Sequence, residues 1–471
     1  MKRKVSLNLK EIIPLKTLKF MRDNWKLMTA ILVVVVAVAW VSSQWNKWFG
    51  NPAEEPYAGL TEPGRILLTF GDENELSRNV SWMGDTQLQD AYLELIDTEG
   101  ADTLQVKAEG EVFKSRAGQM AFYHAKLRDL AYGHHYQYRA VTGNAASAWY
   151  AFSTPEENQK SYSFMYVGDI QDSIGGITNS LLKEALKRNP EMEFFLCAGD
   201  LLERPTDAYW NEMFCTLDSI AQSMPVLNAT GNHDYLKAPI YKLERRWSLV
   251  FSHYLDSMVG ENQVYNLKYR DMEFFVLDGT REFLFLPAQR TWLQDKLMNS
   301  TAKWKVVVIH QPLFSIRGEW KNVVQKWAFN DLLEKYDVDL VLQGHEHAYA
   351  RTSRTDSQGE EQTPVYLISH CSTKNYLVEF PDRFQKMGSG SRYYQKITVH
   401  GDTLGLAARD AYTHELYDSL LIVEHGKQAK VVDLGKNIKE KVFFPGEPKS
   451  KKEKAFVKRI EEYKVKHPSR F

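Results

Sequence analysis

The feature that most constrains this chain is a set of five apolar runs between residues 164 and 342, each followed by residues able to bind a metal ion. The runs and the residues that follow them are Phe164–Val167 before Gly168-Asp169, Phe194–Ala198 before Gly199-Asp200, Val226-Leu227 before Gly231-Asn232-His233-Asp234, Val306–Ile309 before His310, and Leu340–Leu342 before Gly344-His345-Glu346-His347. Helix-length segments alternate with the runs, which predicts a layered α/β domain. Such sheets place their ligands at the carboxyl ends of their strands.

The residue types at these strand ends predict a pair of metal ions. Carboxylate, imidazole and amide oxygen suit Fe, Zn or Mn, and Asp200 is the natural carboxylate to bridge two ions. Two cations roughly 3.5–4 Å apart can hold a hydroxide for attack and a phosphate for in-line displacement. His233 follows Asn232 and can donate a proton to the leaving group. Alone, a Gly-Asp pair is usually a turn and a histidine after a strand is usually structural, so the prediction rests on the whole set.

In its motifs, the sequence resembles the calcineurin-like metallophosphoesterases, and among them the purple acid phosphatase branch. The motifs are Gly231–Asp234, Val308–His310 and Gly344–Arg351, and the similarity covers residues 60 to about 425. The resemblance implies two mixed sheets packed face to face between helices, a four-layer α/β/β/α domain. By position, it implies that Asp169, Asp200 and His347 hold the first metal, that Asp200, Asn232, His310 and His345 hold the second, and that His233 contacts phosphate and assists the leaving group.

The sequence departs from the family at several positions. Glu203 stands where the purple enzymes have a tyrosine ligand, and Gln171 stands where the broader superfamily has a histidine. Either side chain is a hypothetical fourth ligand of the first metal. The family's further active-site histidines after the His310 position are absent. Arg317 is a candidate for binding phosphate there, with a solvated surface arginine as the alternative, and His370 is a candidate to face the cleft.

Residues 65–154 contain short β-type runs between turn residues and no convincing helix, which predicts a β-sandwich. The runs are Arg65–Gly71, Asn79–Gly84, Ala91–Asp97, Thr103–Phe113, Met120–Leu130, His135–Gly143 and Ala148–Thr154. Trp82 is expected at the centre of this domain. Leu130 and Tyr136 resemble the tyrosine corner of fibronectin type III domains, which also precede the catalytic domain in the purple enzymes.

The N-terminal segment predicts a membrane anchor. Residues 27–45 carry no charge, and 19 residues at ~1.5 Å each just span a hydrocarbon core of ~30 Å. Residues 1–26 hold eight basic and two acidic side chains, so this leader is expected in the cytoplasm and the catalytic domain outside it, periplasmic or extracellular. The alternative is a signal peptide cleaved near Ala37–Ala39 or Ser42-Ser43, which would give a secreted enzyme.

The expected organisation therefore has six parts: a basic leader (1–26), a single-pass signal anchor or signal peptide (27–45), a linker (46–60), a fibronectin type III-like domain (61–155), a metallophosphoesterase domain (160–425) and a basic tail (426–471). The tail holds nine basic and three acidic residues over 449–470 and is expected to be solvated, with contact to an anionic membrane as the alternative. The formal net charge of −1 gives no reason to expect nucleic acid as a partner.

These observations predict a two-metal hydrolase that cleaves phosphate monoesters with a metal-bound hydroxide, in the manner of an acid phosphatase. A phosphodiesterase or nucleotidase with the same site is the alternative. A surface-binding protein with an inactive second domain is disfavoured by the complete second-metal set. The expected partners are a phosphate ester and, through the N-terminal helix, a membrane. Segment 235–262 is a candidate specificity loop, although a buried or surface ion pair explains its Arg245 and Arg246 equally well.

Overall fold

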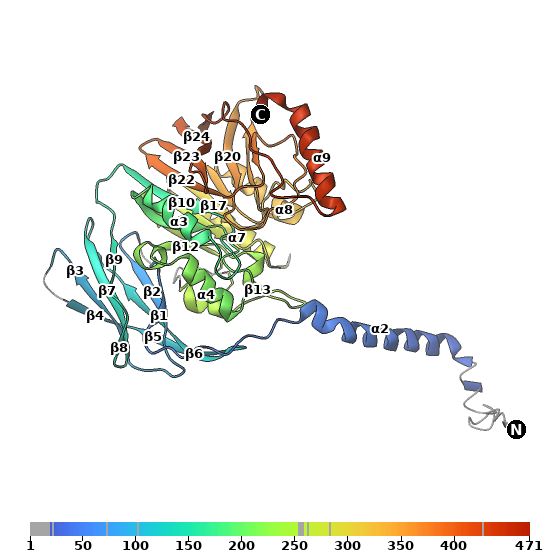
Figure 1. Cartoon of the computed structure of the whole chain (residues 1–471), viewed down its shortest axis with the longest axis horizontal. Coiled ribbons are helices and arrows are strands. Elements are labelled where there is room, and N and C mark those ends of the chain that lie inside the picture. The colour runs from blue at the N-terminus through green and yellow to red at the C-terminus, as the bar shows by residue number, and fades with distance from the viewer. Residues whose placement is uncertain are drawn as a thin grey trace. The chain divides into compact units, whose positions relative to one another are not determined.

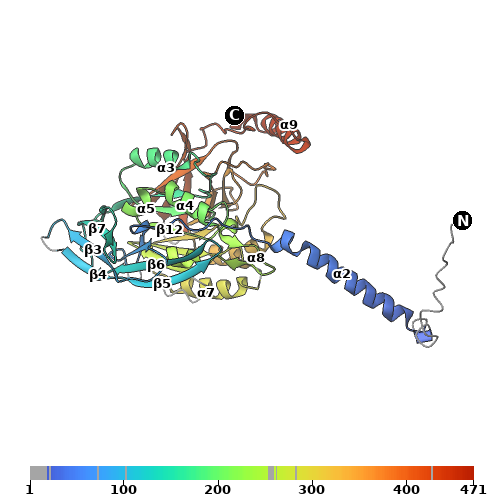
Figure 2. The ribbon, with the colours of Figure 1, turned by 60° about the horizontal axis from the view of Figure 1, so that its bottom comes forward.

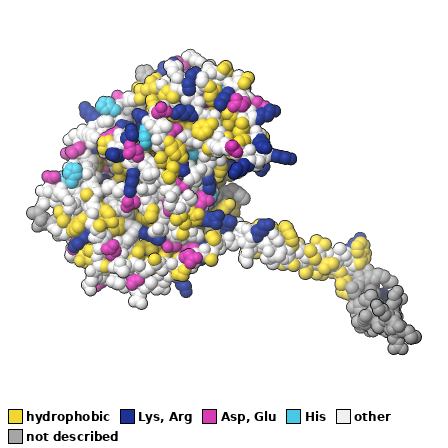
Figure 3. Space-filling model, viewed as in Figure 1, with side chains coloured by type: hydrophobic (Ala, Val, Ile, Leu, Met, Phe, Trp, Pro, Cys, Tyr) yellow, Lys and Arg dark blue, Asp and Glu magenta, His cyan; other side chains and the backbone are white. Residues whose placement is uncertain are grey.

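The structure is a computed structural model that describes residues 19–20, 23–71, 74–100, 103–252, 259–260, 263–281, 284–425 and 428–471. The described chain divides into two units, one containing the N-terminal helix and the other containing Ala53–Leu236 and Ile240–Phe471. The N-terminal helix, α2 (Trp25–Phe49), has 25 residues, a mean hydropathy of 2.1 and no buried side chain. Its length and composition suffice to cross a membrane, and hydrophobic side chains cover much of its visible face (Figure 3). The predicted basic leader lies largely outside the described residues.

The region after the linker folds as two antiparallel sheets around a shared core. One sheet has the order β1-β2-β6-β5, and the other joins β4, β3 and β7 with β8 and β9 both paired to β7. The strands are β1 (Gly64–Phe70), β2 (Arg78–Met83), β3 (Ala91–Asp97), β4 (Thr103–Lys107), β5 (Glu109–Ser115), β6 (Gly118–Leu127), β7 (His135–Thr142), β8 (Ala145–Ala146) and β9 (Tyr150–Ser153). Trp82 lies in the core, as expected. The hydroxyl of Tyr136 accepts a hydrogen bond of 2.9 Å from the backbone N–H of Ala131.

The prediction of one strand over Thr103–Phe113 is wrong. The chain crosses between sheets at Ala108, so that β4 pairs with β3 and β5 pairs with β6. Ala108 N–H donates to the carbonyl of Ala91 at this crossing. Ala108 itself is neither glycine nor proline, and the glycine of the run, Gly110, lies two residues later, inside β5. An isolated glycine in a strand pattern can mark an irregularity, and this was the one signal of a break in the run.

The second domain contains two mixed sheets. The first has the order β12-β11-β10-β22-β23-β24-β25, and the second has the order β15-β16-β17-β18-β20-β19-β21. Strands β10, β11 and β12 run parallel, as do β16, β17, β18 and β20. The bounds are β10 (Ser161–Val167), β11 (Met192–Cys197), β12 (Val226–Asn228), β15 (Tyr265–Tyr269), β16 (Met272–Leu277), β17 (Trp304–Ile309), β18 (Leu340–Gln343), β19 (Tyr349–Thr355), β20 (Glu361–Ile368), β21 (Lys386–Gly388), β22 (Tyr393–His400), β23 (Thr403–Asp410), β24 (Leu416–His425) and β25 (Gln428–Asp433).

These sheets pack face to face between two helical layers. Alternate side chains of each strand point to opposite faces; in β10, Phe164 enters the core between the sheets and Met165 enters the outer core beneath the helices. Helices α3 (Thr178–Lys187) and α4 (Asp207–Thr216) cover the first sheet, and α7 (Leu286–Asn299), α8 (Val323–Lys335) and α9 (Lys451–Lys466) cover the second. Figure 1 shows α3 opposite α8 and α9, and Figure 2 shows α3 opposite α7. The order of layers is α/β/β/α.

The C-terminal segment differs from the predicted solvated tail. β25 extends the first sheet, and α9 buries Phe456, Ile460 and Tyr463 in the core between the second sheet and its helices, where Phe380 stacks on Phe456 and Tyr463. These residues recur at spacings of four and three, which places them on one face of a helix. The basic side chains that dominate the composition occupy the remaining positions, so a charge count alone concealed the amphipathic pattern.

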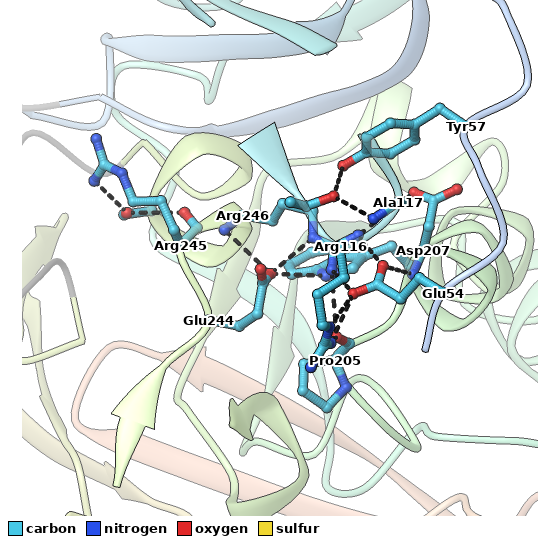
Figure 4. A network of polar contacts seen from close by, with 12 residues as sticks. Glu54, Tyr57, Arg116, Ala117, Pro205, Asp207, Glu244, Arg245 and Arg246 are labelled. Atoms are coloured by element: carbon cyan, nitrogen blue, oxygen red, sulfur yellow. Dashed lines mark hydrogen bonds and ion pairs between the residues drawn. The ribbon is translucent and has the colours of Figure 1, made fainter. Parts of the chain in front are cut away.

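Part of the predicted linker packs into the larger of the two units, which contains Ala53–Leu236 and Ile240–Phe471. The buried carboxylate of Glu54 accepts hydrogen bonds of 2.9 Å from both Nη atoms of Arg246 and one of 2.7 Å from Nε of Arg116 (Figure 4). Arg246 begins α6 (Arg246–Val250) and also pairs with Glu244 at 2.9 Å. Of the two explanations for this arginine, the structure favours the buried ion pair. The network joins the linker, the β domain and the segment that follows β12.

Candidate metal centre

The predicted ligands converge at the carboxyl ends of strands from both sheets. Asp169 follows β10, Asp200 follows β11, and His310 follows β17, while the histidines of the last motif follow β18. Ligand atoms of Asp200, His310 and His345 lie within 4.8 Å of one another, and so do those of Asp169, Asp200 and His347. Asp200 belongs to both groups. The geometry of a shared carboxylate between two clusters is the one expected from the sequence.

Hydrogen bonds fix the imidazole rings of the second cluster. Nδ1 of His310 lies 2.8 Å from the carbonyl of Ala198, and a carbonyl can only accept, so Nδ1 carries a proton and Nε2 is the ring nitrogen that a cation would bind. Burial lowers the pKa of His310, but Asp200 and Asp169 outweigh it and raise that pKa to about 10, so a bound cation would take the place of the proton on Nε2. That Nε2 lies 3.2 Å from Oδ2 of Asp200. Nδ1 of His345 lies 2.8 Å from Oδ1 of Asn232, which brings the predicted amide ligand beside the same cluster.

Close backbone approach shapes the loops that carry these residues. Asp169, Asp200, His345 and His347 all have positive φ angles, between 39° and 72°, a conformation that non-glycine residues rarely adopt. A Cβ on Gly231 would lie 2.1 Å from Oδ1 of Asp200. Only glycine lets the chain pass so close to the shared carboxylate. Non-glycine residues held in this region of φ/ψ space cluster at functional sites.

The electrostatics of the site favour cation binding. Asp169 and Asp200 are both buried, with exposed fractions of 0% and 1%. Burial and the charge of Asp200 together raise the pKa of Asp169, whereas at Asp200 the effect of burial is outweighed by His310, which lowers its pKa. Burial lowers the pKa of His345 to about 3 and that of His347 well below its ordinary value. The neutral imidazoles of His345 and His347, together with the two buried carboxylates, form a set of donors whose negative charge bound cations would balance.

Several of these ligand atoms make no well-directed hydrogen bond among the described residues and instead face one another, with Nε2 of His310 3.2 Å from Oδ2 of Asp200 and Nε2 of His347 3.3 Å from Oδ1 of Asp169. They are Oδ1 of Asp169, Nε2 of His310 and both ring nitrogens of His347. Buried polar atoms are almost always paired in folded proteins. Oxygen and imidazole nitrogen donors that converge without partners suit first-row transition metals. The residues present therefore fit a pair of cations.

The two candidates for an additional ligand have different surroundings. Gln171 lies inside the site, where its Nε2 is 3.4 Å from Oδ2 of Asp200 and its buried Oε1 has no partner among the described residues. The carboxylate of Glu203 instead pairs with Nζ of Lys374 at 2.5 Å. The backbone carbonyl of Glu203 accepts a hydrogen bond of 2.7 Å from Nδ1 of His233. Of the two, Gln171 has the oxygen available for a metal.

The other predicted residues lie around the first cluster. Arg317 places its guanidinium 4.4 Å from the ring centroid of Tyr376, and that ring lies 4.4 Å from the ring of His347. His370 is fully buried, with its ring 5.7 Å from that of His347, so it packs behind the cluster. Glu346 accepts hydrogen bonds from Ser315 and from the backbone of Ile316, which fixes the loop that carries Arg317.

Two further residues of the site, Lys374 and Tyr376, were not predicted from the sequence. Both lie in the loop after β20, which runs parallel to β18. The rule that ligands gather at the carboxyl ends of parallel strands applies to β20 as well. Applied to the whole loop that follows β20, and not to His370 alone, this rule would have made Lys374 and Tyr376 candidates.

Comparison with known proteins agrees with this geometry. Residues 162–349 match the family of calcineurin-like phosphoesterases, and residues 63–154 match the purple acid phosphatase N-terminal domain. The chain is 26% identical over 247 residues to probable purple acid phosphatase 20 of Arabidopsis thaliana, which covers 49% of this chain and 56% of that protein. It is 25% identical over 348 residues to purple acid phosphatase 5 of Arabidopsis thaliana, covering 66% and 79%. The solved structure of PhoD aligns with a TM-score of 0.59 and 14% identity over 88% of this chain and all of that one.

Proposed function

Because the chain carries a calcineurin-like phosphoesterase domain behind a purple acid phosphatase N-terminal domain, we propose that it is a metal-dependent phosphoric ester hydrolase that cleaves phosphate monoesters. The observation that carries this proposal is the position of Asp200 in both ligand clusters. A carboxylate shared by two clusters is the arrangement that a two-metal hydrolase requires.

The two clusters divide the ligands between the metals. Asp169, Asp200 and His347 would hold the first ion, with Gln171 as a further candidate, and Asp200, Asn232, His310 and His345 would hold the second. When bound, the ions supply Lewis acidity toward the phosphate and make water a nucleophile near neutral pH. The chain's own residues orient this chemistry: the carbonyl of Ala198 fixes the ring of His310, and the glycines at the strand ends admit the close packing.

His233 is the proposed general acid. Its backbone N–H donates to Oδ1 of Asp200 at 2.8 Å, and its Nδ1–H donates to the carbonyl of Glu203. These two contacts leave Nε2 as the ring nitrogen able to carry a second proton. A protonated Nε2 can donate to the leaving oxygen of the ester.

The finer assignments outside the site have support of their own. The hydrogen bond from Ala131 N–H to the Tyr136 hydroxyl supports a fibronectin type III-like β domain.

The apolar α2 and the basic residues before it support a single-pass anchor with the catalytic domain outside the cytoplasm. Amino-terminal sequencing of the mature membrane-bound protein tests the anchor: an intact leader is expected, and a start after residue 37 would indicate a cleaved signal peptide.

The activity is tested with a panel of phosphomonoesters and phosphodiesters, each assayed after reconstitution of the full chain with Mn, Zn or Fe. Hydrolysis of monoesters that is abolished by chelation and restored by metal is the expected result. Faster hydrolysis of diesters would favour the phosphodiesterase alternative. Hydrolysis that persists in a metal-free protein, or no hydrolysis with any of the metals, would contradict the proposal.

A further inference from the structure

Lys374, which is not one of the predicted metal ligands, lies at the edge of the candidate site. Nζ of Lys374 pairs with Oε2 of Glu203 at 2.5 Å, and the side chains are 34% and 20% exposed. An ammonium group has three N–H donors, so this contact leaves two of them for another acceptor. The group is therefore held in place and remains accessible.

The loop that carries Lys374 lies against the first cluster. The ring of Tyr376, two residues further along the chain, lies 4.4 Å from the ring of His347, which belongs to that cluster. The loop of Lys374 and its partner Glu203 therefore both lie beside the candidate metal site.

Each cation is held by a neighbour. Glu203 binds Lys374 through its carboxylate and His233 through its carbonyl, so one residue fixes both the cation and the proposed general acid. Arg317 lies against the ring of Tyr376, which in turn lies against His347. Both cations are thereby connected to residues of the metal site rather than to distant surface.

We propose that Lys374 is a substrate-positioning residue, which binds a non-bridging phosphate oxygen of the ester while Arg317 binds another. Glu203 positions Lys374 for this role. The inference rests on the proposed function. A phosphate monoester near pH 7 carries about −1.5 to −2 charges, and charge-assisted hydrogen bonds from lysine and arginine are the usual means of holding it.

The test measures binding as well as turnover, in the metal-loaded full chain. Lys374→Ala is expected to weaken the binding of inorganic phosphate, measured by calorimetry, by about 10- to 100-fold, the range of one hydrogen bond to a charged group. KM for a phosphomonoester should rise by a similar factor, with a smaller change in kcat and unchanged metal content. Lys374→Arg should recover part of the loss. Glu203→Gln, which keeps the carbonyl for His233, should weaken phosphate binding less than Lys374→Ala.

Lys183 provides a matched control, because it forms an exposed ion pair with Asp218 at 2.8 Å and takes no part in the site. Lys183→Ala should bind phosphate as the wild type does. Wild-type phosphate affinity and KM in Lys374→Ala would overturn the inference, and so would a loss of metal in that variant, which would assign the lysine to the metal centre. If the wild type hydrolyses no ester yet its phosphate binding depends on Lys374, the proposed function fails and the inference stands.

Discussion

The backbone N–H of His233 donates a 2.8 Å hydrogen bond to Oδ1 of Asp200. This contact ties the proposed general acid directly to the carboxylate shared by both ligand clusters. It depends on Gly231, where any side chain would collide with the same oxygen. The proposed proton donor, His233, and the proposed metal bridge, Asp200, are consequently held in a fixed position relative to each other.

Replacing His233 by Asn should therefore impair proton donation without removing the metals. We expect kcat for an alkyl phosphate to fall by about 10²- to 10⁴-fold, the usual contribution of general acid catalysis. For p-nitrophenyl phosphate the loss should be much smaller, because its leaving group needs no proton. Steady-state kinetics on both substrates, with metal analysis of the same samples, checks this. An equal loss on the two substrates would remove His233 from the role of acid.

The Glu54–Arg246 pair should be essential to the stability of the larger unit, which contains both folded domains. Both side chains are 1% exposed, and removing one partner of a buried pair typically costs about 3–5 kcal/mol. Without Glu54, both Nη atoms of the buried Arg246 lose the carboxylate to which they donate, whereas Nε keeps its hydrogen bond to Glu244. Glu54→Ala should therefore lower the free energy of unfolding in urea by an amount of that order. The adjacent Arg245–Glu111 pair is a matched control, since its side chains are 41% and 49% exposed. Glu111→Ala should cost about 0–1 kcal/mol, and equal effects of the two variants would contradict the prediction.

Asp339 should make stability fall between pH 4 and pH 7. Burial raises the pKa of this carboxyl to about 7, although the N–H of Lys305 donates to it at 2.8 Å. In this window the folded protein keeps a proton that the unfolded chain has released, so the free energy of unfolding decreases as pH rises and levels off above the folded pKa. The total loss is on the order of a few kcal/mol.

Asp339→Asn provides the check on this assignment. The amide oxygen of asparagine can still accept from Lys305, and the side chain has no proton to lose. Denaturant unfolding from pH 4 to pH 8 should therefore show a flatter profile than the wild type and higher stability at pH 8. The same slope in both proteins would assign the pH dependence to another group.

The candidate metal site could be predicted from the sequence because the strands that carry it are buried on both faces. β10, β11 and β17 read as nearly uninterrupted apolar runs, so the polar residue that ends each run stands out. The structure brings Asp169, Asp200 and His310 together from those ends. Their assignment to particular metals stays a prediction.

The parts that sequence analysis missed depend on contacts between distant residues. The role proposed for Lys374 depends on its ion pair with Glu203, which lies in a loop of the other sheet. The two residues are far apart in the chain, and no sequence pattern indicates that they meet. In the same way, Glu54 appeared to belong to a free linker until Arg246 was found beside it. The C-terminal helix is a different case, because the periodic spacing of Phe456, Ile460 and Tyr463 was present in the sequence and was obscured by the surrounding lysines.

The most direct measurement is anomalous scattering from crystals of the metal-loaded protein. If Asp200 bridges two metal ions, two anomalous peaks are expected, one on either side of its carboxylate and roughly 3.5–4 Å apart. One should lie beside Asp169 and His347 and the other beside His310 and His345. Metal-loaded crystals with no peak beside Asp200, or with a single peak that Asp200 does not contact, would contradict it.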